Sequence, residues 1–449
     1  MVRSQPLPKK RNTIRSSEKY TAMKAVISRL ATTLGLFSFL GLLSLTCLSQ
    51  AAEQANAPKS AVVSLTNFAP NLPILSLQTT QQIVSEPKVP CRVRLVLPGE
   101  SATTSTGTFS GLVRIHGATS QMYPKKSFGL TLGAPVPWLG MRESTQWVLM
   151  AAFVDRSLMR HKLSYDLFRS LSVSNAPRFA SASRFVEVNL NGKYHGAYLL
   201  MERVDRAMLQ LRRYDSNAPH HAVIYKAEDH VANFDRLGHG GWEQREPDIL
   251  TGEYWGPLDR FNRFVSTTKD PDFFDPANGI PARLDLENTI DFHLLVLLTS
   301  NMDGIDKNLM LARHEPQTNA PVPRFFFVPW DYDATFGRNW NAHRVSPNEW
   351  LSNHLFNRLL GDPGYRKKFG ARWKQLRQRE FSVATIHRMI DDNARTLGEA
   401  TKRNETRWRT LTGPYPDRLG FEEDLAQMRD WVVARTKWLD GEIERRTTQ

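Results

Sequence analysis

Two acidic loops in the second half of the chain contain the residues best suited to chemistry. The first reads Asp303-Gly-Ile-Asp306-Lys-Asn308 and precedes an apolar run, while the second, Asp331-Tyr-Asp333, follows an apolar run rich in phenylalanine. A loop before one strand and a loop after another can place carboxylates and an amide around a single point. A hard divalent cation takes oxygen ligands of this kind, usually one or two carboxylates together with the phosphates of a substrate.

The spacing within these loops indicates specific roles. Asp303 and Asn308 are spaced as Asp-x-x-x-x-Asn, the pattern of the protein-kinase catalytic loop, and Asp331 begins a segment that stands where Asp-Phe-Gly would. The His-Arg that normally precedes the catalytic Asp is missing here. We predict Asp303 as the base that orients an acceptor hydroxyl, with Asp306 as its competitor. Asn308 and Asp331 are the predicted metal ligands, with Asp333 as second choice or co-ligand. The alternative for the first loop is a solvated Asp/Asn turn before a strand.

A basic turn before a predicted strand supplies candidates for phosphate binding. Lys125 and Lys126 precede the strand-like run 127–132, and Lys126, which directly adjoins it, is the preferred residue for neutralising nucleotide phosphates. The chain lacks a Gly-x-Gly-x-x-Gly loop, so the turn 117–124, which includes Ser120, is expected to cover the phosphates instead. The alternative is a solvated basic turn.

Arg160 lies on a helix predicted to start after Asp155. A kinase helix at this point offers a Glu to the strand Lys, whereas this one offers Arg160 and a lysine. Arg160 is therefore predicted to act in catalysis, either by reaching phosphate or by pairing with Glu202.

Composition excludes some classes of protein. The twelve histidines show neither His-x-x-x-His nor His-Glu-x-x-His spacing, which argues against a zinc hydrolase. The formal net charge is +14, and residues 1–51 carry eight Lys or Arg against one acidic residue. The remaining surface is mildly basic, which suits phosphate-bearing or acidic partners but gives no nucleic-acid signature.

The N-terminal segment has the pattern of a secretory signal. A basic stretch ends at Arg29, an uncharged apolar run covers 30–45, and small residues precede position 52. We predict a signal peptide over 1–51, a flexible leader over 52–60, and an exported protein, periplasmic or extracellular, with no stable membrane span after cleavage. The alternative is an uncleaved anchor. After cleavage Cys91 is the one cysteine, so no intramolecular disulfide can form.

The remaining chain divides into a strand-rich part and a helix-rich part. Residues 61–205 contain alternating strand-like runs and one helix, and Asn191-Gly192 between two such runs predicts a type I′ hairpin. Residues 206–449 are mainly helical, carry the acidic loops and end in a helical tail. The pattern predicts an α+β fold with an antiparallel-sheet lobe that includes one helix, followed by a mainly helical lobe.

Six motifs in a fixed order carry a resemblance to a known family. They are Arg114-x-His-Gly-x-x-Ser, Pro124-Lys-Lys-Ser-Phe, Asp155-Arg-Ser-Leu-Met-Arg-x-Lys, Asn191-Gly-x-Tyr-x-Gly-x-Tyr-Leu-Leu-x-Glu, Asn301-x-Asp, and Trp330-Asp-Tyr-Asp-x-x-Phe-Gly. The chain resembles the CotH family of spore-coat-type atypical protein kinases over roughly residues 60–380. The resemblance implies a bilobal protein-kinase-like fold, ATP as donor with Mg²⁺ or Mn²⁺, and Ser/Thr of an exported protein as acceptor. It also implies that Glu202 and Arg203 border the adenine, partly through backbone groups.

Two further hypotheses stay open from the sequence. One is a phosphotransferase that acts on a glycan or a small molecule. The other is a catalytically inactive pseudokinase that serves as an assembly scaffold, a reading against which the intact Asp303, Asn308 and Asp331 argue.

Overall fold

The computed structural model describes residues 71–100, 106–218, 220–317, 322–408 and 419–448. All of them belong to one compact unit, Ser64–Gln449. The predicted signal peptide (1–51) and leader (52–60) lie outside the described residues. Among the described helices, none combines the length and the apolar character that a membrane crossing requires.

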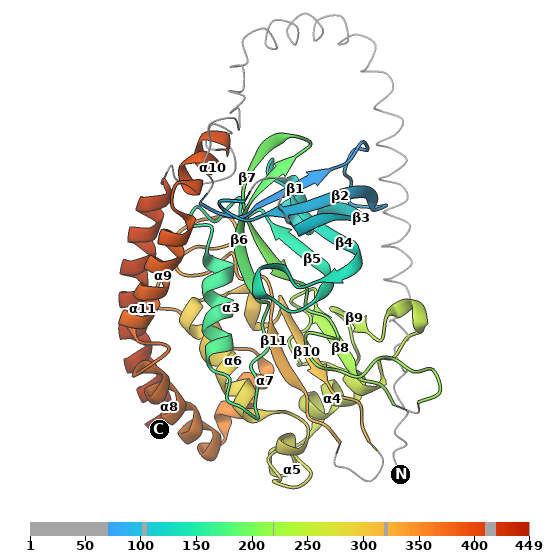
Figure 1. Cartoon of the computed structure of the whole chain (residues 1–449). Coiled ribbons are helices and arrows are strands. Elements are labelled where there is room, and N and C mark those ends of the chain that lie inside the picture. Colours follow the sequence, from blue (N-terminus) through green and yellow to red (C-terminus); the bar gives the residue numbers. More distant parts are fainter. Residues whose placement is uncertain (1–70, 101–105, 219, 318–321, 409–418, 449) are drawn as a thin grey trace, which may run out of the picture. The chain divides into compact units, whose positions relative to one another are not determined.

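Seven strands close into a barrel in the order β1-β2-β3-β4-β5-β7-β6 (Figure 1). The closing pair, β1 with β6, is parallel, and the other neighbouring pairs are antiparallel. The strands are β1 (Ile74–Gln78), β2 (Val89–Val96), β3 (Thr106–His116), β4 (Ser127–Val136), β5 (Ser144–Met150), β6 (Ser183–Leu190) and β7 (Lys193–Glu202).

Alternating side chains explain the barrel. In β2 every second residue is buried, so Val93 and Leu95 join Leu130 of β4 and Leu200 of β7 in one apolar core. The predicted hairpin is confirmed, because β6 and β7 pair across a turn in which Asn191 and its following glycine have φ values of 51° and 79°. Positive φ at both central residues is what a type I′ turn requires.

The predicted bilobal protein-kinase-like fold is wrong. In place of an open antiparallel sheet that forms one lobe with a helix, the structure has a closed barrel, a separate small sheet and helices. The barrel closes because Leu75 and Leu77 of β1 pair in parallel with Val188 and Leu190 of β6. Pairing between segments more than a hundred residues apart leaves no local turn signal, which is why the sequence pattern did not show it.

A second sheet has the strand order β11-β10-β8-β9 and carries the acidic loops at the ends of its strands. Its strands are β8 (Val223–Ala227), β9 (Trp242–Glu246), β10 (Leu309–Arg313) and β11 (Phe326–Pro329). Helix α6 (Leu286–Thr299) packs on this sheet, and the rings of Phe292 and Phe327 stack at 4.8 Å. The Asp285 side chain caps α6 by accepting hydrogen bonds from two backbone N–H groups.

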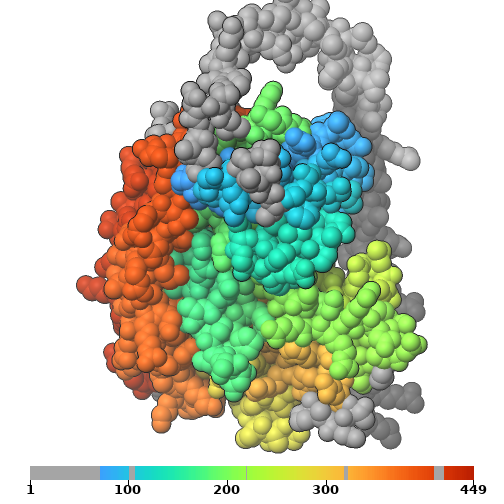
Figure 2. Space-filling model, viewed as in Figure 1, coloured from blue at the N-terminus to red at the C-terminus, as the bar shows by residue number. Residues whose placement is uncertain are grey.

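The remaining helices surround these two sheets. Helix α3 (Arg160–Ser170) packs against α6, and α11 (Phe421–Thr448) packs against α6, α8 and α9. In Figure 2 the C-terminal helices, coloured orange to red, occupy one side of the described chain. The other helices are α4 (Gly256–Thr267), α5 (Asp270–Phe273), α7 (His354–Gly361), α8 (Pro363–Arg377), α9 (Val383–Leu397) and α10 (Ala400–Trp408).

Candidate active site

The structure brings the two acidic loops together. Leu309 at the start of β10 pairs with the last residue of β11, and the Trp330 N–H donates to the Asn308 carbonyl at 3.2 Å. The Asn301 side chain links the loops again, because its amide donates to the Asp331 carbonyl at 3.3 Å while its oxygen accepts from a backbone N–H of the first loop. Asn308 and Asp331 therefore lie on neighbouring backbone segments, as their positions beside strands predicted.

Asp331 is held in place by helix α3. Its Oδ1 lies 3.2 Å from His161 Nε2, and its N–H donates to the Tyr165 hydroxyl at 2.9 Å. The side chain remains 41% exposed, and its φ of 57° is uncommon for a residue with a side chain. Burial raises the pKa of Asp331, but the hydrogen bond and charge of His161 outweigh it and lower this pKa overall.

A negative charge on Asp333 is unfavourable because this side chain is buried close to the carboxylate of Asp331. Burial and then the charge of Asp331 raise the pKa of Asp333 to about 7. For His161, burial lowers the pKa, but the hydrogen bond that its Nε2 donates to Asp331 and the charge of Asp333 raise it overall. A buried carboxylate whose pKa is raised by a neighbouring carboxylate is stabilised by an added positive charge, either a proton or a cation.

The residues present fit a divalent cation. Asn308, with φ 53°, makes no side-chain hydrogen bond within the described ranges, so its amide oxygen is available as a ligand. Together with Asp331 and Asp333 it offers the oxygen donors that Mg²⁺ prefers. In the part of the chain that the structure describes, no group of three or more His, Cys, Asp or Glu is arranged to hold a metal. A magnesium site with one or two carboxylates and a substrate phosphate does not need such a group.

In the first loop, the two candidates for the base, Asp303 and Asp306, make different contacts. Asp306 Oδ1 lies 2.8 Å from His230 Nδ1, whereas Asp303 lies 3.8 Å from His230 Nε2 and 3.7 Å from Lys307 Nζ. Burial raises the pKa of Asp306, with His230 acting in the opposite direction. Asp303 is thus the less engaged carboxylate of the two. The contact of His230, from a loop far upstream in the chain, gave no signal in the sequence.

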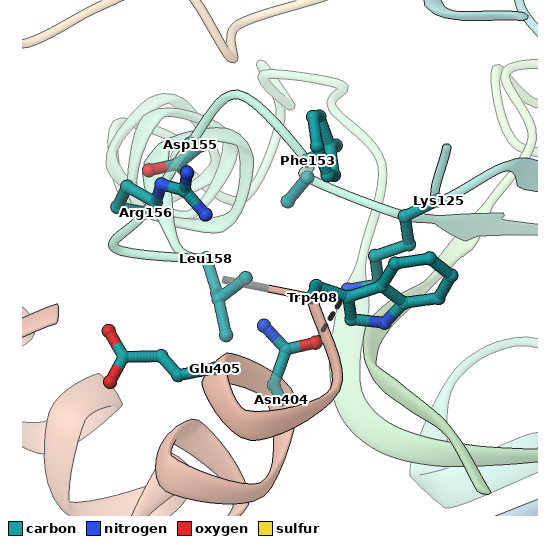
Figure 3. A pocket seen from close by; sticks show the side chains of 9 residues that line it. Lys125, Phe153, Asp155, Arg156, Leu158, Asn404, Glu405 and Trp408 are labelled. Carbon is teal, nitrogen blue, oxygen red and sulfur yellow. Dashed lines mark hydrogen bonds between the residues drawn. The ribbon is translucent and has the colours of Figure 1, made fainter. Parts of the chain in front are cut away.

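Lys125 lies in a pocket between the barrel and α10 (Figure 3). The Lys125 amine donates to the carbonyls of Ala151 and Ala197 at 2.7 and 2.5 Å and to Asn404 Oδ1 at 2.9 Å. Burial and then the charge of Arg156 hold the pKa of Lys125 well below its usual value. All three donors of the ammonium group are used within the protein.

The turn between β3 and β4 lies close to the acidic loops. The ring of His116, which ends β3 just before this turn, lies 6.4 Å from the ring of Trp330, the residue directly before Asp331. Lys126 Nζ donates to the Gln121 carbonyl at 2.6 Å. Gly117 is required here because its φ of 103° is a backbone conformation that residues with a side chain rarely adopt. Ser120 lies within this turn, and Lys126 is bonded back to it from the start of β4.

Arg160 and Glu202 lie in separate polar networks. Arg160 has no exposed surface and bonds to Asp155, to Asp424 of α11 at 2.7 Å, and to the Thr335 carbonyl at 2.9 Å. The Glu202 carboxylate instead accepts from the N–H groups of Arg142 and Ala182, both at 3.2 Å. The proposed pairing of Arg160 with Glu202 is not formed.

Three side chains near Asp331 that carry an amine or an imidazole were given no role from the sequence. His161 bonds to it, and the charges of Lys226 and His116 also lower its pKa. Lys226 interrupts the apolar strand β8, and this is the signal that could have indicated it. His116 lies within the first of the motifs above but was given no role.

The site therefore has the components of a phosphate-transferring enzyme: carboxylate and amide oxygens on two joined loops, with cations close by. The family model described as CotH kinase protein matches residues 113–439, and the chain belongs to this family. The chain is also 27% identical over 288 residues to "Inner spore coat protein H" of Bacillus subtilis (strain 168), covering 60% of this chain and 72% of that protein. Family membership indicates a kinase-like phosphotransferase that uses a nucleotide and a divalent metal.

Proposed function

We propose that the protein is an exported kinase that transfers the γ-phosphate of ATP to Ser or Thr of an exported protein, with Mg²⁺ or Mn²⁺. The observation that carries the proposal is the junction of the two acidic loops, where Asn308, Asp331 and Asp333 offer oxygen ligands. Asp303 lies on the same loop as Asn308 and is the less engaged carboxylate of that loop. Membership in the CotH kinase family supports the reaction class.

Some residues of the site would position the reactants, and others would hold the cation that neutralises the phosphate charge. Asp303 would orient the acceptor hydroxyl, since phosphoryl transfer depends on positioning and charge neutralisation more than on a strong base. Asp331, Asp333 and Asn308 would hold the cation, which supplies neutralisation of the phosphate charge when bound. His161 and Tyr165 fix the orientation of Asp331 from α3. The buried Arg160 anchors the N-terminus of the same helix, so it would act by positioning.

Export is the part of the proposal that depends on the N-terminal segment. The basic stretch and apolar run before residue 52 support a cleaved signal.

Phosphate transfer from labelled ATP by the purified full-length chain tests the function. Acceptors would be the protein itself and Ser/Thr-rich substrates, with Mg²⁺ or Mn²⁺, beside the Asp331→Ala protein. We expect label that needs the metal and falls by roughly a hundredfold or more in the variant, since a positioned charge of this kind contributes several kcal/mol. Absence of both transfer and ATP-induced thermal stabilisation would contradict the proposal and favour a scaffold.

A further inference from the structure

Positively charged side chains from different parts of the chain surround His116 at the end of β3. Burial, followed by the charges of Arg114 and Arg203 and also that of Lys226, lowers the pKa of His116 to about 4. Arg114 lies two residues before His116 on the same face of β3, where both lie against Gly129 of β4. Arg203 reaches Gln146 of β5, the strand next to β4. We call Arg114, Arg203 and Lys226 the cationic group.

The strand geometry places Lys226 on the same face as the start of the second acidic loop. Ile224 of β8 shares an apolar cluster with Val204, Met310 and Trp330. Side chains two residues apart lie on one face of a strand, so Lys226 lies on this face too. Lys226 also pairs in register with Met310, two residues after the predicted metal ligand of the first loop.

Two members of the cationic group have acidic partners, because Glu228 lies 2.5 Å from Lys226 and Glu86 forms an ion pair with Arg114. The other nearby acids pair with cations outside the group: Glu243 lies 2.9 Å from Arg245, and Asp205 lies 3.0 Å from Arg142. Their negative charge is therefore largely used in these pairs.

Arg203 has other positively charged side chains near it. Its guanidinium makes one long contact, 3.5 Å to Gln146 Oε1, and no ion pair with any carboxylate of the described residues. Burial and then the charges of Arg245 and Arg114 lower the pKa of Arg203 overall, although the charges of Asp205 and Glu243 act in the opposite direction. A half-buried guanidinium that is repelled by its neighbours is stabilised when an anion binds.

The position of the cationic group near the second acidic loop indicates which kind of anion it would bind. The His116 ring lies 6.4 Å from the ring of Trp330, the residue directly before Asp331. Guanidinium groups match phosphate oxygens with two parallel hydrogen bonds, and several cations together suit an extended chain of phosphates. A polyphosphate here would lie between the cations and the carboxylates of the second loop.

We propose that Arg203 and Lys226, with Arg114, form the site that binds the polyphosphate of the nucleotide beside Asp331. The proposal rests on the proposed function and replaces the role that the sequence gave to the lysines before β4. Lys125 has all three ammonium donors bonded within the protein, and Lys126 Nζ is bonded to the turn that precedes it.

Calorimetric titration of the full-length chain with ATP, adenosine and inorganic tripolyphosphate, each with Mg²⁺, tests the site. In Arg203→Met and Lys226→Met we expect ATP and tripolyphosphate affinity to fall roughly tenfold to a hundredfold, as for loss of a charged hydrogen bond. Adenosine affinity should stay unchanged.

Thermal unfolding without ligand provides a second measurement that separates binding from a structural role. Arg203→Met should raise the unfolding midpoint, because it removes repulsion and breaks no ion pair. The matched control is Arg403→Met in α10, which loses its ion pair with Glu187. It should lower the midpoint and keep tripolyphosphate affinity.

The possible outcomes distinguish this site from the proposed function. Parent-like ATP and tripolyphosphate binding by both Arg203→Met and Lys226→Met, or an equal loss of adenosine binding, overturns the site. Loss of ATP binding in Lys126→Met alone also overturns it. If the parent binds tripolyphosphate through Arg203 but binds no ATP, the anion site stands and the ATP-dependent function fails. A parent chain that binds neither ligand rejects the site.

Discussion

At the residue scale, the surroundings of Asp331 and Asp333 give these two neighbouring carboxylates different pKa values. Asp331 keeps its charge because His161 lies 3.2 Å away, whereas Asp333 is raised to a pKa of about 7 by burial and by Asp331. A folded protein that holds two such groups without a cation loses stability at neutral pH and above. This is the arrangement expected of a site that is completed by a bound cation.

Asp333→Asn should therefore stabilise the protein and weaken metal binding at the same time. At pH 8 and without metal, we expect the free energy of unfolding to rise by about 1–2 kcal/mol, because a repelled carboxylate becomes neutral. The gain in unfolding midpoint that Mg²⁺ and ATP give the parent protein should shrink. Differential scanning calorimetry with and without Mg²⁺-ATP measures both. A variant that is less stable and still gains fully from Mg²⁺-ATP would reject a metal role for Asp333.

At the element scale, one buried carboxylate fastens α11 to the active-site region. Asp424 of α11 has no exposed surface and bonds to Arg160 at 2.7 Å and to Arg338 at 3.2 Å. Arg160 begins α3, whose next residue, His161, orients Asp331. The position of α3 thus depends on a helix near the C-terminus of the chain.

Asp424→Asn should cost about 3–5 kcal/mol in the free energy of unfolding, because it leaves two guanidinium groups buried without their full partner. Urea unfolding followed by tryptophan fluorescence measures the loss. Glu422→Gln on the exposed side of the same helix is the matched control and should change stability by less than about 0.5 kcal/mol. Equal effects of the two substitutions would show that Asp424 has no special role.

Sequence reasoning succeeded where the determining interaction is local. The Asn191-Gly192 hairpin was predicted because positive φ at two residues is a property of those residues alone. Asn308 and Asp331 were placed together because each flanks a strand. The barrel was missed because β1 closes on β6 in parallel across more than a hundred residues. The burial of Lys125 was missed because its partners lie on three distant segments, Asn404 among them.

At the scale of the whole molecule, buried histidines set how stability depends on pH. His293 of α6 is fully buried, lies 4.3 Å from the ring of Phe356, and donates from Nε2 to the Leu351 carbonyl at 2.9 Å. Burial lowers its pKa from 6.5 to about 4. The pKa values of His116 and His195 are lowered to about 4 as well, chiefly by burial. Each of these imidazoles is neutral in the folded protein at pH 5 but charged in the unfolded chain.

The sign of the effect follows from proton counting. Between pH 6.5 and 4 the unfolded chain binds a proton at position 293 that the folded protein does not bind. Stability is therefore fully present above pH 6.5 and is lost as the pH falls, by up to about 1.4 kcal/mol per pH unit for this group. Asp333 acts in the opposite direction up to pH 7, since its raised pKa favours the folded state in acid.

His293→Gln should reduce the loss of unfolding free energy as the pH falls, while the contribution of Asp333 is the same in both proteins. Glutamine does not titrate and can still donate to the Leu351 carbonyl, so the difference in unfolding free energy between parent and variant should shrink by about 2–3 kcal/mol from pH 7 to pH 4.5. Chemical unfolding at half-unit pH steps measures it, and His343→Gln at the exposed surface is the control that should leave the slope as it is. A difference between parent and His293→Gln that stays constant over this range would mean that His293 accepts a proton in the folded core. The aromatic cluster around α6 would then have to accommodate a charge, and acid unfolding would depend on the carboxylates and the other histidines.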